Sequence, residues 1–327
     1  MALLDIEDLR LSFYTKRGIV SVLRGVSLSI NEGEVLGIVG ESGSGKSLTA
    51  YSVLGLLPPN AHIDGGSVRF KGEDILNADK RRLNAIRGNR ISIIFQDPMT
   101  SLNPTERIGR QITESLLLHT DASKAEANLR AIDMLKAVGI RSAEDRMHQY
   151  PHELSGGMRQ RVMIAMSLAC DPDLLIADEP TPALDVTVAE EILDLLKMLG
   201  RERRMAIMMI THDLGTVASI CDEVAVMYGG RIVERGRTED IFYSAEHEYT
   251  RALLNSVPSL DRKKQLVPIG GSPIDLSCVN DGCPFAPRCA SAMRICLKKY
   301  PDSFIISNTH TAACYAYPKR RAAEAEE

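Results

Sequence analysis

The stretch Gly40-Glu41-Ser42-Gly43-Ser44-Gly45-Lys46-Ser47 decides the fold class of this 327-residue chain. It follows an apolar run at 34–39 and precedes a stretch with helical spacing at 46–57, so a strand, a turn and a helix are expected here. Glycines in such a turn let backbone N–H groups face inward and hold phosphate oxygens at the N-terminus of a helix. Lys46 is expected to reach the β- and γ-phosphates of a nucleotide, and the Ser47 hydroxyl to bind Mg²⁺. The stretch therefore predicts an α/β fold with a phosphate-binding loop.

Length and composition exclude several classes of protein. With 44% hydrophobic and 25% charged residues, the chain has the composition of an ordinary globular protein, and one large domain with a smaller addition is expected. The net charge of −4, without long Lys or Arg runs, argues against a nucleic-acid partner. The acidic residues near the N-terminus do not fit a signal peptide. The longest uncharged stretch, 47–62, is too short to span a membrane, so any membrane role is expected through a partner.

The spacing of apolar residues predicts the order of the other elements. Alternation over 3–30 indicates antiparallel strands with one face in water, and helical spacing over 105–146 indicates a helical insertion. Alternating helices and strands then predict a parallel sheet covered on both faces, with elements at 157–170, 174–177, 186–199 and 206–210. A hairpin is expected within 223–236. The Pro, Gly and Cys content beyond Pro258 predicts a domain boundary near that residue.

An apolar strand that ends in two carboxylates supplies groups that the phosphate-binding loop lacks. Its sequence is Leu174-Leu175-Ile176-Ala177-Asp178-Glu179. Asp178 is expected to hold Mg²⁺ through water, and Glu179 to act as general base for an attacking water. Alone, such a pair is more often a solvated strand end or a helix cap. Together with the phosphate-binding loop, the pair favours nucleotide hydrolysis.

A second potential anion site occurs in the stretch Leu154-Ser155-Gly156-Gly157-Met158-Arg159-Gln160. Ser-Gly-Gly at the start of a helix offers backbone N–H groups to an anion, but no lysine completes the site. One chain therefore holds two half-sites. Taken by itself, the stretch fits equally well an ordinary Ser N-cap followed by two flexible glycines.

In this order, the three stretches resemble the motifs of ABC ATPases, and the resemblance covers residues 3–256. It implies a P-loop NTPase core with an antiparallel β subdomain, a helical subdomain at about 97–156, and a small cysteine-containing C-terminal extension. The ATPase domain is expected to occupy 1–257 and the extension 258–327.

The resemblance also implies roles for single residues. Ser155, Gly156 and Gly157 form the signature, which would meet the γ-phosphate of ATP bound to the opposite subunit. Gln96 resembles the Q-loop glutamine that links Mg²⁺ and water to a transmembrane partner, and His212 resembles the switch histidine that contacts the γ-phosphate and supports the base. The implied cofactors are ATP and Mg²⁺. The Mg²⁺ ligands would be Ser47, Gln96 and Asp178.

The resemblance extends to an aromatic residue near the N-terminus and to a loop that follows the carboxylate pair. Phe13 aligns with the aromatic residue that stacks on adenine in this family. Tyr14 is the alternative for this role. If Tyr14 fills it, Phe13 is an ordinary aromatic residue of the core. Ala183-Leu184-Asp185 matches the D-loop that crosses the dimer interface, where Asp185 would take part in the nucleotide site. Pro182 departs from the Ser, Thr or Gly usual at its position, and proline fixes φ and removes a hydrogen-bond donor.

The stretches at 96–104 and 247–254 are similar to the dipeptide and oligopeptide importer branch of the family. This branch also contains nickel, glutathione and opine importers, and Glu248 stands where it usually has proline. The resemblance implies an ATPase that powers import of di- or oligopeptides, with the same motor role for nickel, glutathione or another solute as the alternative. Implied partners are a paralogous ATPase subunit in a heterodimer, two transmembrane permease subunits and, indirectly, an extracytoplasmic binding protein. The chain would lie peripherally on the cytoplasmic face of the membrane.

A soluble ABC ATPase without a transport role is the rival class. A DNA-repair ATPase of this kind would need a long coiled-coil insertion, and a translation factor would carry two cassettes in one chain. Neither feature occurs in the sequence. An exporter ATPase is also compatible with the motifs.

Five of the seven cysteines lie between 278 and 314, which favours metal ligation in a chain that is not expected to form disulfides. Four thiolates serve either zinc or an iron–sulfur cluster. The residue contexts at Cys283 and Cys289 resemble the tail of dipeptide-importer ATPases that hold a [4Fe–4S] cluster. The resemblance therefore favours such a cluster, with zinc or free or oxidised thiols as the alternatives and Cys278 as a bystander. The expected ligands are Cys283, Cys289, Cys296 and Cys314.

Overall fold

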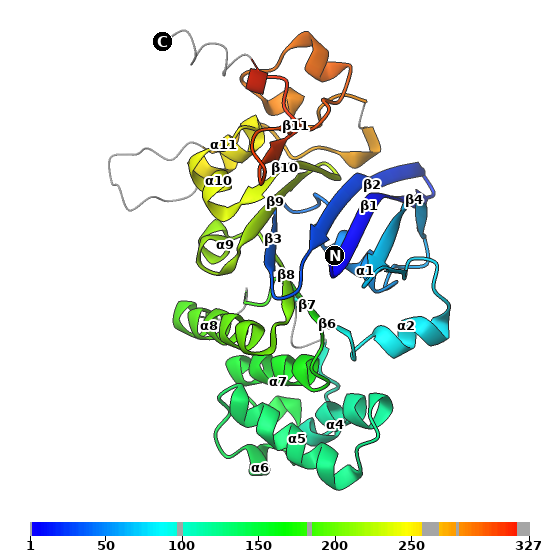
Figure 1. The fold of residues 1–327 in the computed structure, drawn as a ribbon, viewed down its shortest axis with the longest axis vertical. Helices are drawn as coiled ribbons and strands as arrows, with labels where there is room; N and C mark the ends of the chain where they lie inside the picture. The colour runs from blue at the N-terminus through cyan, green and yellow to red at the C-terminus, as the bar shows by residue number, and fades with distance from the viewer. Residues whose placement is uncertain (1, 97–100, 182–184, 257–267, 279–280, 319–327) are drawn as a thin grey trace. The chain divides into compact units, whose positions relative to one another are not determined.

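The computed structural model describes the chain except for residues 1, 97–100, 182–184, 257–267, 279–280 and 319–327 (Figure 1). The chain forms two compact units. The first contains Met1–Ile30, Leu36–Leu76 and Thr211–Glu327, and the second contains Asn31–Val35 and Asn77–Ile210. Within the described ranges, no helix is both long enough and apolar enough to cross a membrane.

An antiparallel sheet forms the N-terminal part of the first unit. Its strand order is β2-β1-β4-β5, and its strands are β1 (Leu4–Thr15), β2 (Gly18–Ile30), β4 (Ala61–Phe70) and β5 (Glu73–Asp74). In β1 the side chains of Ile6, Leu9 and Leu11 are buried while that of Arg10 is exposed. The alternation predicted over 3–30 is therefore confirmed, and it gives the sheet one buried and one solvated face.

The first unit also contains strands that come from distant parts of the chain. The order β11-β12-β10-β9-β3 joins β3 (Val35–Val39), β9 (Glu223–Tyr228), β10 (Arg231–Arg237), β11 (Phe304–Ile305) and β12 (Thr311–Ala312). β3 and β9 are parallel, while β9 and β10 form the predicted hairpin around Gly229 and Gly230. Because β12 pairs with β10, residues near the C-terminus are built into the edge of this sheet.

The described residues of the first unit also form helices. They are α1 (Lys46–Val53), α9 (Leu214–Ile220), α10 (Thr238–Tyr243) and α11 (Glu248–Asn255). Three short 3₁₀ turns follow at Leu276–Cys278, Ala286–Arg288 and Arg294–Leu297. α1 ends before residue 57, where its end was predicted, because Gly55 takes a positive φ of 59° just after the helix.

The second unit combines parallel strands with a group of helices. The strand order β8-β7-β6 joins β6 (Ile91–Ile94), β7 (Leu174–Asp178) and β8 (Ala206–Thr211). Its helices are α2 (Lys80–Ile86), α4 (Ile108–His119), α5 (Lys124–Ala137), α6 (Ala143–Arg146), α7 (Gly156–Leu168) and α8 (Val186–Arg203). All residues of β7 and β8 are buried, as expected for parallel strands covered on both faces. Helices α4 to α6 occupy the predicted helical insertion.

Candidate functional site

The predicted phosphate-binding loop connects β3 to α1 in the first unit. Gly40 and Gly45 have φ values of 154° and 105°, which side chains rarely allow. A Cβ at Gly40 would lie 2.1 Å from the backbone oxygen of Met227, and one at Gly45 would lie 2.7 Å from the Leu23 side chain. Gly40 is therefore required by the close approach of backbone, whereas Gly45 is favoured chiefly by its positive φ.

The amine of Lys46 folds over its own loop. The side chain is buried, and Nζ donates hydrogen bonds to the carbonyl oxygens of Gly40 at 2.8 Å and Glu41 at 3.0 Å. Ser47 is half-buried in the first turn of α1. The lysine charge is thus placed inside the loop, where the sequence pattern predicts phosphate binding.

The predicted Mg²⁺ ligand and general base follow each other in the second unit. Asp178 is the buried last residue of β7. Glu179 has an unusual positive φ of 46°, and its backbone N–H donates to the oxygen of Ile210 at 2.8 Å. Its carboxylate accepts a hydrogen bond of 2.7 Å from Nε2 of Gln96. The predicted Q-loop glutamine and the predicted base therefore lie in direct contact.

The Ser-Gly-Gly stretch opens α7 in the second unit. Ser155 is the N-cap residue, and its Oγ accepts from the backbone N–H of Met158 at 3.4 Å. Ser155 and Gly156 are exposed, and a Cβ built at Gly156 would meet no other atom within 4 Å. The helix N-terminus is thus open on this side, as a site for an external anion requires.

Asp185 and Gln160 have local structural partners in the second unit. Asp185 caps α8, because its Oδ1 accepts from the N–H of Val188 at 3.0 Å. Nε2 of Gln160 donates to the oxygen of Pro180 at 2.6 Å, which ties α7 to the segment that follows Glu179. The rest of the predicted D-loop, Ala183 and Leu184, lies outside the described residues with Pro182.

The remaining predicted residues lie in the first unit. His212 follows β8 on the surface, and Asp213 next to it caps α9. Phe13 is half-buried in β1, while the exposed Tyr14 contacts the ring of His62 edge-on with 4.4 Å between ring centroids. Among the predicted catalytic residues, Gln96 and Glu179 are in direct contact.

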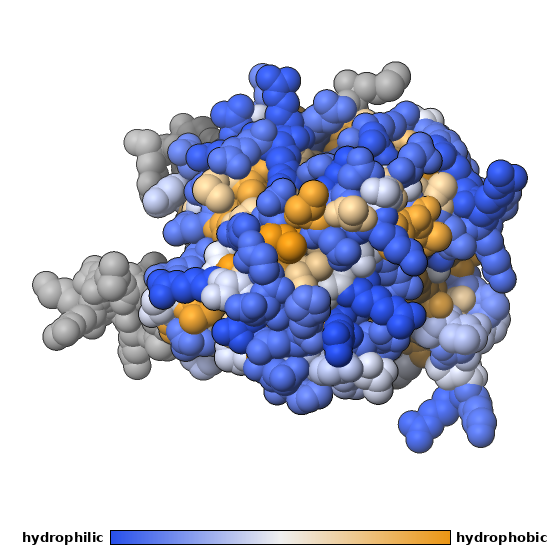
Figure 2. All heavy atoms as spheres, turned by 90° about the horizontal axis from the view of Figure 1, so that it is seen from below, coloured by the Kyte–Doolittle hydropathy of each residue, from blue (hydrophilic) through white to orange (hydrophobic). Residues whose placement is uncertain are grey.

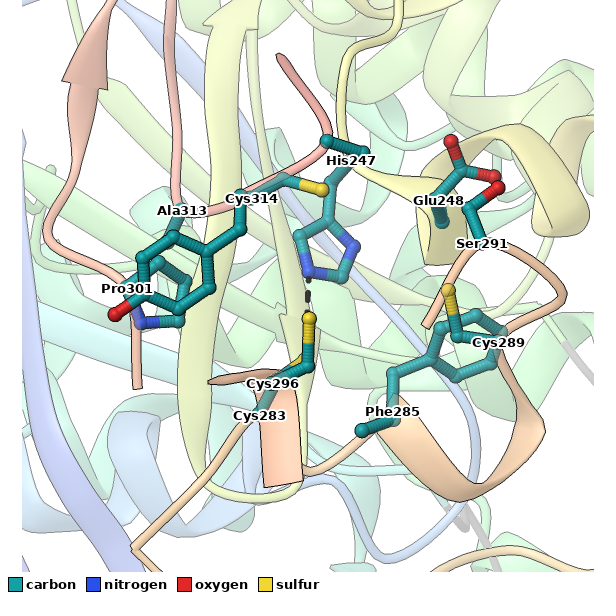
Figure 3. A pocket seen from close by; sticks show the side chains of 13 residues that line it. His247, Glu248, Cys283, Phe285, Cys289, Ser291, Cys296, Pro301, Ala313 and Cys314 are labelled. Atoms are coloured by element: carbon teal, nitrogen blue, oxygen red, sulfur yellow. Dashed lines mark hydrogen bonds between the residues drawn. The ribbon is translucent and has the colours of Figure 1, made fainter. Parts of the chain in front are cut away.

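The four cysteines that were predicted as metal ligands do line one small pocket, together with His247 (Figure 3). Its volume of about 20 Å³ leaves room for roughly one water molecule and not for a four-iron cluster. Burial raises the pKa of Cys283 to about 12 and that of Cys289 to about 11, so both remain protonated at neutral pH.

The metal prediction for these cysteines is consequently wrong. In the described part of the chain, no three side chains of His, Cys, Asp or Glu form a group that could hold a metal ion. Neither the [4Fe–4S] cluster expected at Cys283, Cys289, Cys296 and Cys314 nor zinc at these residues is supported. Within the pocket, Sγ of Cys283 lies 4.0 Å from Nε2 of His247.

Comparison with known proteins assigns the family. The profile described as "ABC transporter" matches residues 23–182, and the profile "Oligopeptide/dipeptide transporter, C-terminal region" matches residues 233–296. The oligopeptide transport ATP-binding protein OppD of Salmonella typhimurium is 55% identical over 314 residues, which cover 96% of this chain and 93% of the relative. The chain belongs to the ABC transporter family.

Other members of the ABC transporter family agree with this assignment. The dipeptide transport ATP-binding protein DppD of Bacillus subtilis is 49% identical over 97% of this chain and 95% of its own length. Among solved structures, the ATP-binding cassette MJ0796, a dimer bound to ADP and Pi, is 28% identical with a TM-score of 0.65 over 72% of this chain and 98% of that one. The predicted ABC ATPase fold and family are confirmed.

Proposed function

We propose that this ABC ATPase is the ATP-hydrolysing subunit that powers import of di- or oligopeptides through a separate membrane permease. The observation that supports ATP hydrolysis coupled to transport is the 2.7 Å contact between Gln96 and Glu179. This contact joins the proposed base to the segment that leads into the helical insertion. The names of the relatives and the match to a peptide-transporter C-terminal region favour peptides as cargo. Nickel, glutathione or another solute is the alternative cargo for the same motor.

Each proposed catalytic residue has a separate task in the ATPase cycle. Lys46 would exchange its bonds with the loop carbonyls for the β- and γ-phosphates, while Ser47 and Gln96, together with Asp178 through water, would hold Mg²⁺. Glu179 accepts a proton from the attacking water, and Gln96 orients that carboxylate. His212 contacts the γ-phosphate. An aromatic ring of the first strand, Phe13 or Tyr14, stacks on adenine.

A second ATPase subunit completes the proposed site. Ser155, Gly156 and Gly157 lack a lysine, so they serve the γ-phosphate on the opposite subunit, with Asp185 at the same interface. The opposite subunit is a paralogue in a heterodimer. Two permease subunits, fed by an extracytoplasmic binding protein, complete the assembly. The ATPase would then lie on the cytoplasmic face of the membrane.

The helical insertion is the proposed docking region for the permease. Figure 2 views the chain from the side of α4 to α6 and shows small hydrophobic patches within a mostly hydrophilic surface. Exposed apolar residues of these helices are Leu117, Leu118 and Leu129. Leu102, in the stretch 96–104 that is similar to the importer branch, is only 2% exposed, and Met99 lies outside the described residues. A crosslinker at Leu118, 74% exposed, is the better probe.

Reconstitution tests the cargo proposal. The ATPase, its paralogue, the permease and the binding protein are incorporated into vesicles, and uptake of labelled dipeptides, oligopeptides, Ni²⁺ and glutathione is compared with MgATP present. We expect ATP-dependent uptake of peptides. Uptake of Ni²⁺ or glutathione without peptide uptake would identify the alternative cargo, and ATP-driven export would contradict an import role.

A further inference from the structure

The second residue of the phosphate-binding loop is connected to the C-terminal part of the chain through a buried ion pair. Nη1 of Arg288 lies 2.7 Å from Oε2 of Glu41, and the two side chains are 7% and 21% exposed. The same nitrogen donates to the hydroxyl of Tyr228 at 3.1 Å. Glu41 lies in the predicted phosphate-binding loop, but no sequence motif assigns a separate role to its side chain or to that of Arg288.

The Arg288 guanidinium is held on its other side by backbone oxygens. Nε donates to the oxygen of Gly270 at 2.8 Å, and Nη2 donates to that of Ile269 at 3.4 Å. A planar guanidinium with several bonded nitrogens has a fixed direction, unlike a lysine amine. Arg288 thereby ties the segment around residue 270 to the loop, and it holds the Glu41 carboxylate in one place.

Glu41 is also bonded through both of its backbone groups. Its N–H donates to the hydroxyl of Tyr249 at 2.9 Å, and its carbonyl oxygen accepts from Nζ of Lys46 at 3.0 Å. Burial raises the pKa of Tyr249, so the phenol stays neutral and its oxygen remains available to the N–H. The position of Glu41 is therefore linked on one side to Arg288 and on the other to the lysine that would bind phosphate.

A second contact region supports this connection. The loop residues from Glu41 to Ser44 share a pocket of about 230 Å³ with Tyr228, Gly229 and the segment from Pro273 to Leu276. The C-terminal part of the chain thus meets the loop at Arg288 and again along this pocket. Both contacts lie inside the first unit.

We propose that Arg288 is a positioning residue for the phosphate-binding loop, through which the C-terminal part of this chain sets the affinity for MgATP. The inference rests on the proposed nucleotide site. Without Arg288, the partly buried Glu41 carboxylate loses its charged partner, and residue 41 gains conformational freedom that nucleotide binding must remove again. Arg288 has no proposed contact with the reacting atoms, so its loss should act on binding and not on the chemical step.

The test measures MgATP binding to the full-length chain by titration calorimetry. Arg288→Ala should raise the dissociation constant about tenfold, the effect expected when a charge-assisted hydrogen bond of the binding conformation is lost. Arg288→Lys should give a smaller increase in the dissociation constant, because lysine keeps the positive charge but lacks the planar, multiply hydrogen-bonded guanidinium. Glu41→Gln together with Arg288→Ala should be no worse than Arg288→Ala alone, because both changes remove the same contact. In the reconstituted complex, Arg288→Ala should raise KM for ATP and leave kcat unchanged.

Arg235→Ala is the matched control, since it removes a partly buried ion pair with Glu223 in the same unit, away from the loop. Its thermal unfolding should shift as that of Arg288→Ala does, while its MgATP affinity stays that of wild type. An unchanged dissociation constant in folded Arg288→Ala, or an equal loss in Arg235→Ala, would overturn the positioning role. If Lys46→Ala also binds MgATP normally, the nucleotide site itself is misassigned, which is a separate failure.

Discussion

Hydrogen bonds of its backbone N–H and of its carboxylate hold Glu179 and fix the direction of its side chain. Its N–H bonds to Ile210, and its carboxylate bonds to Gln96, while the backbone adopts a positive φ that is uncommon outside glycine. Such backbone conformations persist where the surrounding structure enforces them, often at functional sites. The arrangement suits a base that must meet one water in one orientation.

Replacing Glu179 by Gln tests this assignment. Gln keeps the size and the contact with Gln96 but cannot accept a proton from water, so ATP hydrolysis by the reconstituted complex should fall by about 10²- to 10⁴-fold. MgATP binding should be retained. Glu191→Gln, which removes an exposed carboxylate paired with Arg161, should keep wild-type activity. Equal hydrolysis by wild type and Glu179→Gln would exclude Glu179 as the base.

The pocket thiols provide a pH-dependent prediction. Burial raises the pKa of Cys283 to about 12 and that of Cys289 to about 11, both above the unfolded value, so the folded state keeps these protons longer. Their contribution to stability is complete below about pH 8.5 and is lost as the pH rises through 11 to 12. At pH 8, iodoacetamide should label both cysteines slowly in the folded chain and rapidly in denaturant. Fast labelling of the folded chain, measured by mass spectrometry, would contradict the raised pKa values.

The functional roles of single residues could be predicted only where those residues belong to a recognisable sequence motif. Lys46, Asp178 and Glu179 follow from local patterns of glycine, lysine and carboxylates beside apolar strands. The pair Arg288 and Glu41 has no local signal, since 247 positions separate the two residues and neither side chain is unusual in its context. The cysteine spacing suggested a shared metal site, which is wrong; the four cysteines do line one pocket, but spacing alone could not reveal its small volume.

Among the elements, β10 and β12 are joined by a buried carboxylate. Glu234 on β10 accepts from Nε2 of His310 at 2.8 Å and from the N–H groups of Glu246 and His247 at 2.6 and 3.0 Å. Both side chains of the His310–Glu234 pair are at most 2% exposed. The C-terminal strand is therefore anchored to the hairpin by a polar contact inside the protein.

Removing this anchor should destabilise the first unit. His310→Ala leaves one oxygen of buried Glu234 with fewer donors, which should lower the free energy of unfolding by about 2 kcal/mol in urea titrations. Thr309→Ala, which removes a more exposed hydrogen bond to Asp240, should cost less. Adding Glu234→Gln to His310→Ala should cost less than the sum of the single changes, because the buried charge is removed. Additive costs would argue against a direct coupling.

Helices and strands with a regular pattern of apolar residues could be predicted from the sequence, whereas those with an irregular pattern could not. The runs that became β3, β7 and β8 are apolar throughout, and the helix at α8 has a clear apolar face. β4 was missed because its sequence contains Asp64, Gly65 and Gly66, which suggest a turn. Its pairing with most of β1, from Leu4 to Phe13, supplies the stability that its own sequence does not.

On the scale of the whole molecule, the chain carries two potential phosphate sites, and only one of them contains a lysine. The loop from Gly40 to Ser47 has its lysine inside. The start of α7 is open and has Ser155 as a cap but no lysine within its motif. Two incomplete sites per chain fit an assembly in which each nucleotide contacts two subunits.

Separate loss of the two half-sites distinguishes their roles. In the isolated chain, Lys46→Ala should abolish MgATP binding, because it removes the charge that replaces phosphate hydration within the loop. Gly156→Asp should leave binding by the same chain unchanged, since position 156 has open space for a side chain and serves a nucleotide held by another subunit. In the reconstituted complex, however, Gly156→Asp should reduce ATP hydrolysis on the order of a hundredfold, because its carboxylate repels the γ-phosphate. Binding to isolated chains can be followed by calorimetry and hydrolysis by phosphate release. If Gly156→Asp weakens binding by the isolated chain as strongly as Lys46→Ala does, both half-sites serve one nucleotide within a single subunit.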